Sequence, residues 1–157
     1  MIFCTIGTQA PFDRFLRIID DIAPEMGGEE VIVQAFKDKY EPKHVKTVQM
    51  LPPDEFNGIF ASARMIIGHA GMGTIISALT QDKPIIVFPR IAALGEHRNE
   101  HQLATAKKMN ELGYVYVANN EKELRELVLK KDLKPLHELG PFASKSLIED
   151  IINVIDM

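Results

Sequence analysis

The sequence has little cysteine and no surplus of positive charge. One of its 157 residues is a cysteine, Cys4, and a lone thiol cannot close an internal disulfide. Lys and Arg number 18 against 22 Asp and Glu, which gives a formal net charge of −4. Proteins that wrap duplex nucleic acid usually carry a basic surplus. These absences indicate a reducing compartment, predict a buried packing role for Cys4 and disfavour a nucleic-acid partner.

Long hydrophobic runs are absent as well. Residues 1–6 are apolar, but they are too few for a signal peptide or a transmembrane helix and have no charged leader. The longest later apolar runs, such as residues 85–89, have the length of a strand. We therefore expect a cytoplasmic protein without a transmembrane segment. The chain is 46% hydrophobic and 25% charged, and its length suits one folded domain over residues 1–157.

Short apolar runs rich in Ile, Val and Phe alternate with helical patterns along the chain. The runs predict strands at residues 1–6, 30–36, 45–48, 65–68, 85–88 and 114–117. The intervening segments predict helices at residues 12–22, 53–63, 74–80, 99–112, 120–130 and 144–154. This alternation is typical of βαβ units. It predicts an α/β fold, a Rossmann-like parallel sheet of about six strands with helices on both faces. Such sheets bind ligands at the carboxyl ends of their strands, near the topological switch point.

A glycine-rich turn, Gly68-His-Ala-Gly-Met-Gly-Thr74, joins a predicted strand to a predicted helix. Glycine lets the backbone approach a ligand closely, and the N–H groups at a helix start attract phosphate. The turn has Ile76 where the dinucleotide fingerprint has its third glycine, and it lacks the Gly-Lys-Ser/Thr of a P-loop. A tight turn that needs glycine only for packing fits the pattern as well as an anion site does.

Gly7 and Thr8 follow the first predicted strand and form a second, weaker candidate. Their N–H groups and the Thr8 hydroxyl are expected at the same sheet edge as residues 71–74, because both loops follow strands of one parallel sheet. Two such loops meeting at one crevice would grip a diphosphate.

The stretch Glu96-His-Arg-Asn-Glu-His-Gln102 is the most polar segment that follows a buried strand. His97 and His101 are four positions apart and would stack on one face of a helix. With Glu100 they match H-x-x-E-H, an inverted zinc-peptidase motif. That motif needs a third ligand and an open zinc position, and a small parallel α/β domain is not its usual setting. The alternatives are a solvated helix start and a set of polar groups that bind a sugar.

Several segments together resemble a known family. They are Ile67-Gly-His-Ala-Gly-Met-Gly-Thr-Ile-Ile-Ser-Ala-Leu79, then Lys83-Pro-Ile-Ile-Val-Phe-Pro89, then His101-Gln102, and the opening Thr5-Ile-Gly-Thr8 agrees with them. They resemble the C-terminal half of the family-28 glycosyltransferases. The likeness is closer to the stand-alone small subunits of two-component UDP-N-acetylglucosamine transferases and of bacterial exopolysaccharide glycosyltransferases. The resemblance covers nearly the whole chain and implies the donor-binding half of a GT-B fold.

The resemblance also implies roles for individual residues. Those expected to line the donor diphosphate are Gly7, Thr8, Gly71, Met72, Gly73 and Thr74. Leu51 would offer backbone groups to the uracil, and Ser77 would stand at the ribose, where many relatives have a glutamate. His101 and Gln102 would contact the donor sugar.

The function that the resemblance implies is that of a donor subunit. Such a subunit binds a UDP-sugar for an inverting glycosyltransferase that uses no metal and no cofactor, since helix N-termini and loop N–H groups can stabilise the leaving diphosphate. The general base is expected on a separate, membrane-associated partner that binds the acceptor, in polysaccharide or lipid-linked glycan synthesis. A zinc hydrolase that uses His97, Glu100 and His101 stays open as an alternative, as does a non-catalytic nucleotide-binding module.

Overall fold

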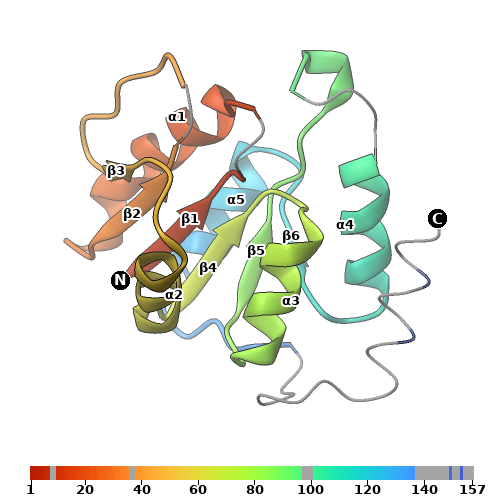
Figure 1. Cartoon of the computed structure of the whole chain (residues 1–157). Helices are drawn as coiled ribbons and strands as arrows, with labels where there is room; N and C mark the ends of the chain where they lie inside the picture. The colour runs from red at the N-terminus through yellow and green to blue at the C-terminus, as the bar shows by residue number, and fades with distance from the viewer. Residues whose placement is uncertain (8–9, 36–37, 97–100, 137–148, 150–152, 154–157) are drawn as a thin grey trace.

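The computed structural model describes residues 1–7, 10–35, 38–96, 101–136, 149 and 153 (Figure 1). Its strands are β1 (Ile2–Thr5), β2 (Val31–Gln34), β3 (Lys46–Val48), β4 (Met65–Gly68), β5 (Ile85–Val87) and β6 (Tyr116–Val117). Its helices are α1 (Asp13–Ile22), α2 (Pro53–Ser62), α3 (Met72–Thr80), α4 (His101–Glu111) and α5 (Glu121–Val128), with short 3-10 turns η1 (Ala23–Met26) and η2 (Ala92–Leu94). The helix predicted at residues 144–154 lies almost wholly outside the described residues.

The strands form one parallel sheet in the order β3-β2-β1-β4-β5-β6. This is the strand order of the Rossmann fold, so the predicted fold class is confirmed. The chain moves outward from β1 through β2 to β3 and then returns to pair β4 with the other side of β1. The order therefore reverses between β1 and β4, and the crevice used by ligands in such sheets lies beyond the carboxyl ends of these two strands.

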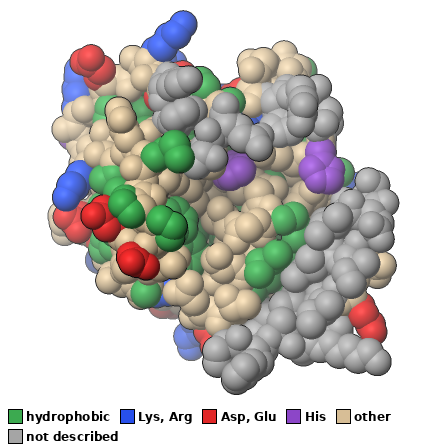
Figure 2. Space-filling view, viewed as in Figure 1, with side chains coloured by type: hydrophobic (Ala, Val, Ile, Leu, Met, Phe, Trp, Pro, Cys, Tyr) green, Lys and Arg blue, Asp and Glu red, His purple; other side chains and the backbone are tan. Residues whose placement is uncertain are grey.

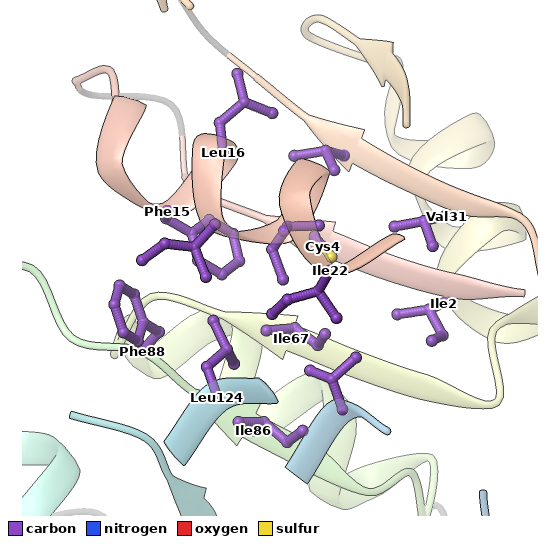
Figure 3. Close-up of a cluster of buried hydrophobic side chains, with 14 of the residues drawn as sticks. Ile2, Cys4, Phe15, Leu16, Ile22, Val31, Ile67, Ile86, Phe88 and Leu124 are labelled. Carbon is purple, nitrogen blue, oxygen red and sulfur yellow. The ribbon is translucent and has the colours of Figure 1, made fainter. Parts of the chain in front are cut away.

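Helices cover both faces of the sheet, which explains the unbroken apolar runs of the strands. On one face α1 and α5 pack on a cluster that includes Ile2, Cys4 and Ile67 (Figure 3). On the other face α2, α3 and α4 pack on a cluster that includes Phe3 and Ile66. Cys4 is fully buried, as predicted, and burial raises the pKa of its thiol well above the usual range. The thiol therefore serves as packing and not as a nucleophile.

Several element boundaries differ from the predicted ones by one or two residues, and two of these differences have a visible cause. Helix α3 begins at Met72, two residues earlier than predicted, because Gly71 takes an extended conformation (φ −84°, ψ 133°) and serves as its N-cap. Strand β6 is shorter than predicted, because the Tyr114 N–H donates to the Met109 carbonyl and closes the end of α4 instead of joining the sheet. None of the helices in the described ranges has the length and apolar character needed to cross a bilayer.

Candidate functional site

The site begins where β1 and β4 end side by side. Thr5 and Gly68 are register partners in the two strands, and the His69 N–H donates to the Thr5 carbonyl at 3.3 Å. The loop that carries Gly7 and the turn that carries Gly71 therefore leave the sheet at the same point. The predicted convergence of these two loops is found at the switch point of the sheet.

The His69 imidazole fills the space between the two loops. A Cβ atom on Gly7 would lie 2.9 Å from His69 Nε2, and a Cβ on Gly71 would lie 2.5 Å from His69 Cε1. Gly7 also has φ +79°, a conformation that favours glycine. Glycine is therefore required at both positions if the histidine ring is to stand between the loops.

Gln102 links this ring to the loop after β5. Its Oε1 accepts the Arg90 backbone N–H at 3.0 Å, and its Nε2 lies 2.9 Å from His69 Nδ1. Because a backbone N–H can only donate, the amide orientation is fixed, and Nε2 donates to His69 Nδ1. In the neutral imidazole the proton must then be on Nε2, the atom that faces Gly7. Gln102 is only 6% exposed, so this connection is buried.

The start of α3 supplies the backbone N–H groups that sequence reasoning assigned to phosphate. The first helical bond runs from the Ile75 N–H to the Gly71 carbonyl, so the amides of Met72, Gly73 and Thr74 precede the hydrogen-bond ladder of the helix. Gly73 is exposed, its φ is not positive, and a Cβ there would meet no atom within 4 Å. The turn thus presents open backbone to the crevice at the positive end of a helix dipole.

The other predicted residues lie farther out or are undescribed. Leu51 is half-buried in the loop between β3 and α2, and β3 is two places away from β1 in the sheet. Ser77 is half-buried one helical turn after Gly73, so both lie on one side of α3. His101 opens α4, is exposed, and has its Nε2 3.5 Å from Thr105 Oγ1. Thr8 lies outside the described residues.

Sequence reasoning missed the role of two residues here, His69 and Arg90. His69 stands inside the quoted glycine motif, but no pattern showed that its ring would contact both Gly7 and Gly71. Arg90 follows a predicted strand and was singled out by no sequence pattern, whereas it is buried at 3% exposure. Arginine is rarely buried without partners, so its position depends on contacts distant in sequence.

Histidine side chains reach the surface in the upper half of the view in Figure 2.

Residues 1–153 match the glycosyltransferase family 28 C-terminal domain. The chain belongs to this family. The predicted resemblance is therefore confirmed over almost the whole sequence, and the glycine turn, the Gly7 loop and Gln102 all lie within the matched family-28 domain.

One family relative is the UDP-N-acetylglucosamine transferase subunit ALG13 of Eremothecium gossypii. It is 29% identical over 92 residues, which cover 58% of this chain and 43% of that protein. A curated ALG13 subunit of Mus musculus is 23% identical over 123 residues, 73% of this chain and 10% of that protein. The chain thus spans less than half the length of these curated relatives.

Solved structures agree with the fold of the family-28 domain. An NMR structure of ALG13 matches with a TM-score of 0.62 at 22% identity, covering 96% of this chain and 93% of that one. The crystal structure of the calicheamicin glycosyltransferase CalG4 matches with a TM-score of 0.58 at 19% identity, covering 98% of this chain and 37% of that one. At these identities the likeness concerns the fold, and it confirms the predicted Rossmann-like half of a GT-B architecture.

Family membership also bears on the H-x-x-E-H match. His97 and Glu100 lie outside the described residues, and within the ranges described no three His, Cys, Asp or Glu side chains form a group that could hold a metal ion. The zinc-hydrolase alternative therefore rests on the motif alone, whereas the family model that matches the chain is that of a glycosyltransferase domain.

Proposed function

We propose that this family-28 domain is the donor-binding subunit of an inverting, metal-independent glycosyltransferase that uses a UDP-sugar. The observation that carries the proposal is the meeting of the Gly7 loop and the α3 N-terminus around His69, at the switch point of a Rossmann-like sheet. In this proposal residues 1–157 act as one nucleotide-sugar-binding domain.

The proposed chemistry needs stabilisation of a leaving diphosphate. An acceptor hydroxyl attacks the anomeric carbon of the sugar, the bond from that carbon to the β-phosphate oxygen breaks, and negative charge collects on the UDP that leaves. The amides of Met72, Gly73 and Thr74, at the positive end of α3, suit that charge. Gly7 and Thr8 are assigned to the opposite side of the diphosphate. No metal is needed for this stabilisation.

The remaining donor contacts follow from the positions around the turn. Ser77 lies one turn along α3 from Gly73, at the proposed ribose, and the backbone near Leu51 is assigned to the uracil. His101 and Gln102 are assigned to the sugar. Two hydrogen bonds hold the Gln102 carboxamide, and the second N–H of its Nε2 has no further bond within the described part of the chain. That N–H is the group we assign to a sugar hydroxyl.

The acceptor and the general base are proposed to belong to a second chain. The relative in Eremothecium gossypii is named as a subunit of a UDP-N-acetylglucosamine transferase, which supports an enzyme of more than one chain. We propose that the partner is membrane-associated and recruits this chain to the cytoplasmic face of the membrane. The product is then an exopolysaccharide or a lipid-linked glycan.

The experiment is reconstitution of sugar transfer. The purified chain is incubated with radiolabelled UDP-N-acetylglucosamine alone, with membranes from a strain that lacks its gene, and with those membranes in the presence of EDTA; the same membranes without the chain are the control. We expect transfer to a lipid fraction only when the membranes and the chain are combined, and we expect EDTA to leave it unchanged. Strong transfer by the pure chain would overturn the two-chain proposal, and loss of transfer with EDTA that zinc or magnesium restores would overturn the metal-independent mechanism.

A further inference from the structure

Arg90, three positions after the end of β5, is a buried cation surrounded by backbone carbonyls. Its side chain is 3% exposed. Its guanidinium donates to four carbonyl oxygens, those of Ile6 (2.6 Å), Ala10 (2.7 Å), Pro11 (2.8 Å) and Glu96 (3.2 Å). Three of these belong to the loop after β1 and one to the loop after β5. The guanidinium therefore connects two loops that flank the crevice.

Holding a charge in this position is unfavourable unless the charge is well solvated by the protein. Burial lowers the pKa of Arg90, and the carboxylates of Glu96 and Asp38 oppose that shift. The Phe12 ring lies beneath the guanidinium, with its centroid 4.7 Å from Arg90 Cζ. Carbonyl dipoles and an aromatic face thus replace water around this cation. A planar group with five donors suits such a ring of acceptors, and an ammonium group does not.

The backbone of Arg90 extends the connection to the glycine turn. Its N–H donates to Gln102 Oε1, and Gln102 Nε2 donates to His69 Nδ1. Through its side chain Arg90 holds the loop that begins at Gly7, and through its main chain it orients the ring that stands between Gly7 and Gly71. Both walls of the crevice are therefore joined to one residue.

An ion pair between Arg14 and Glu96 fixes the loop after β5 to α1. Arg14 Nε lies 2.8 Å from Glu96 Oε2, and Arg14 Nη2 lies 2.9 Å from Glu96 Oε1. Glu96 Oε1 also accepts the Ile91 N–H at 3.0 Å, which closes residues 91–96 into a compact loop. These contacts fix the position of residues 91–96. The Glu96 carbonyl that accepts from Arg90 is therefore held in place.

We infer that Arg90 is a positioning residue for the donor site. It contacts no nucleotide itself; it holds the loops after β1 and β5, and through Gln102 the His69 ring, in the arrangement that receives the diphosphate. The inference rests on the proposed function, because it assigns a purpose to loops that bind UDP in that proposal. The competing interpretation is that Arg90 only stabilises the fold.

Lys83 provides a matched control at the opposite end of the same strand. Its Nζ donates to the carbonyls of Ala61 (2.6 Å) and Ala63 (2.5 Å), and burial lowers its pKa as it does that of Arg90. Lys83 precedes β5 and lies at the amino-terminal edge of the sheet, away from the crevice. Replacing it removes a cation bound to carbonyls without touching the loops of the site.

The test measures UDP affinity of the full chain by calorimetry, at a temperature where every variant is folded by circular dichroism. We expect R90M to bind UDP about tenfold more weakly or worse, and K83M to bind like the wild type even if its thermal stability falls by a similar amount. R90K keeps the charge but reaches fewer carbonyls, so we expect an affinity between those of the wild type and R90M. Hydrogen exchange of the amides in residues 6–12 and 91–96 should rise in R90M and not in K83M.

Each outcome decides between the interpretations. Wild-type affinity in R90M, or an equal loss in K83M, would overturn the inference and leave the proposed function standing. Absence of UDP binding by the wild type would overturn the proposed function, and the inference with it. If R90M does not fold, R90K replaces it: weaker UDP binding with normal thermal stability supports positioning, and unchanged binding overturns it.

Discussion

The three glycines of the candidate site, Gly7, Gly71 and Gly73, differ in backbone conformation and in contacts. Gly7 combines a positive φ with close contact to His69, Gly71 has ordinary backbone but closer contact to the same ring, and Gly73 has ordinary backbone and open space. The first two are required by the structure as it stands. Only Gly73 is left unexplained by packing, so it is the glycine that a ligand best accounts for.

The open space and ordinary φ at Gly73 lead to the first prediction. G73V should fold with stability within about 0.5 kcal/mol of the wild type, because no atom meets the new side chain and valine is no worse than glycine in a helix. Its affinity for UDP should fall about tenfold or more, since the side chain occupies the space of the phosphate. Urea unfolding and calorimetry measure the two quantities.

The matched control is G58V. Gly58 lies in α2, is exposed, and has open space and ordinary φ like Gly73. Equal UDP affinity of G73V and the wild type would remove residues 71–74 from the proposed phosphate site.

The second prediction separates backbone strain from contact with His69. G27A places alanine at φ +68° in open space, and it should destabilise the protein by about 1–2 kcal/mol. G7A adds a contact of 2.9 Å to His69 Nε2 at a similar φ, so its loss of unfolding free energy should be larger, and UDP binding should weaken as well. Equal destabilisation by the two variants, measured in urea, would mean that His69 moves aside without consequence.

The hydrogen bonds that join His69, Gln102 and Arg90 could not be predicted from the sequence. Periodicity places Gln102 near the start of a helix and His69 in a turn, and it says nothing of a bond between residues 33 positions apart. The bond exists because α4 returns to the carboxyl edge of the sheet beside the turn after β4. Family resemblance named Gln102 as a sugar contact, but its buried bridging bonds were visible only in three dimensions.

Helix α1 covers one face of the sheet and also holds the segment before β3 through the side chain of Asp20. Its Asp20 is 1% exposed and accepts hydrogen bonds from the Tyr40 hydroxyl and from the N–H groups of Lys43, His44 and Val45. Burial opposes ionisation of this carboxyl, but the Lys43 and His44 amides and the Tyr40 hydroxyl outweigh it, and the pKa of Asp20 lies below its usual value. One carboxylate thus anchors the irregular segment before β3 onto a helix.

The third prediction concerns this anchor. D20N should lower the free energy of unfolding by about 2–4 kcal/mol at neutral pH, because an amide replaces one acceptor oxygen with a donor facing N–H groups. Since the folded-state pKa is depressed, the stabilisation is present above the unfolded value of about 3.9 and disappears as the pH falls through the folded value.

Urea unfolding as a function of pH measures the effect. The difference between wild type and D20N should shrink as the pH falls below about 4, because the carboxyl takes up a proton first in the unfolded chain and, at lower pH, in the folded one. A difference that stays constant down to the acid transition would show that the ionised state of Asp20 contributes nothing. UDP affinity serves as a control and should not change, because the anchored amides of residues 43–45 precede β3, whereas the proposed site lies beyond the carboxyl ends of the strands.

Most elements were predictable because their signals are local. Apolar runs identified most strands of the sheet, and the helical pattern at residues 120–130 matches α5, whose N-cap Asn120 accepts the Glu123 N–H. The start of α3 was misplaced, since a glycine in the first helical turn looks like a breaker, although N–H groups there need no helical partner. The 3-10 turn η2 was not predicted at all, because its shape depends on the Glu96 contacts to Ile91 and Arg14.

For the whole molecule, ligand binding should appear as added stability. A ligand that binds only the folded state at 100 times its dissociation constant adds about 2.7 kcal/mol. For a chain of this size each kcal/mol raises the melting temperature by about 2–4 °C, so saturating UDP should raise it by about 5–11 °C. GDP and dTDP should give smaller shifts, and G73V should give a smaller shift than the wild type with each nucleotide. Equal shifts with all three nucleotides would leave the phosphate site intact but contradict the assignment of uracil to the Leu51 loop.

The central place of β1 has a consequence for how the protein folds. Ile2 pairs with Val31 on one side and with Met65 on the other, so β1, β2 and β3 can assemble as a half-sheet long before β4 is captured. Until then the free side of β1 is an apolar edge open to pairing with other chains. Pairing of β4 with β1 joins residues about 60 positions apart, and contacts between distant residues form slowly during folding. The same pairing brings together the two loops of the proposed site. During refolding, recovery of nucleotide binding should therefore lag behind the first secondary structure, and losses to aggregation should grow with protein concentration in that interval.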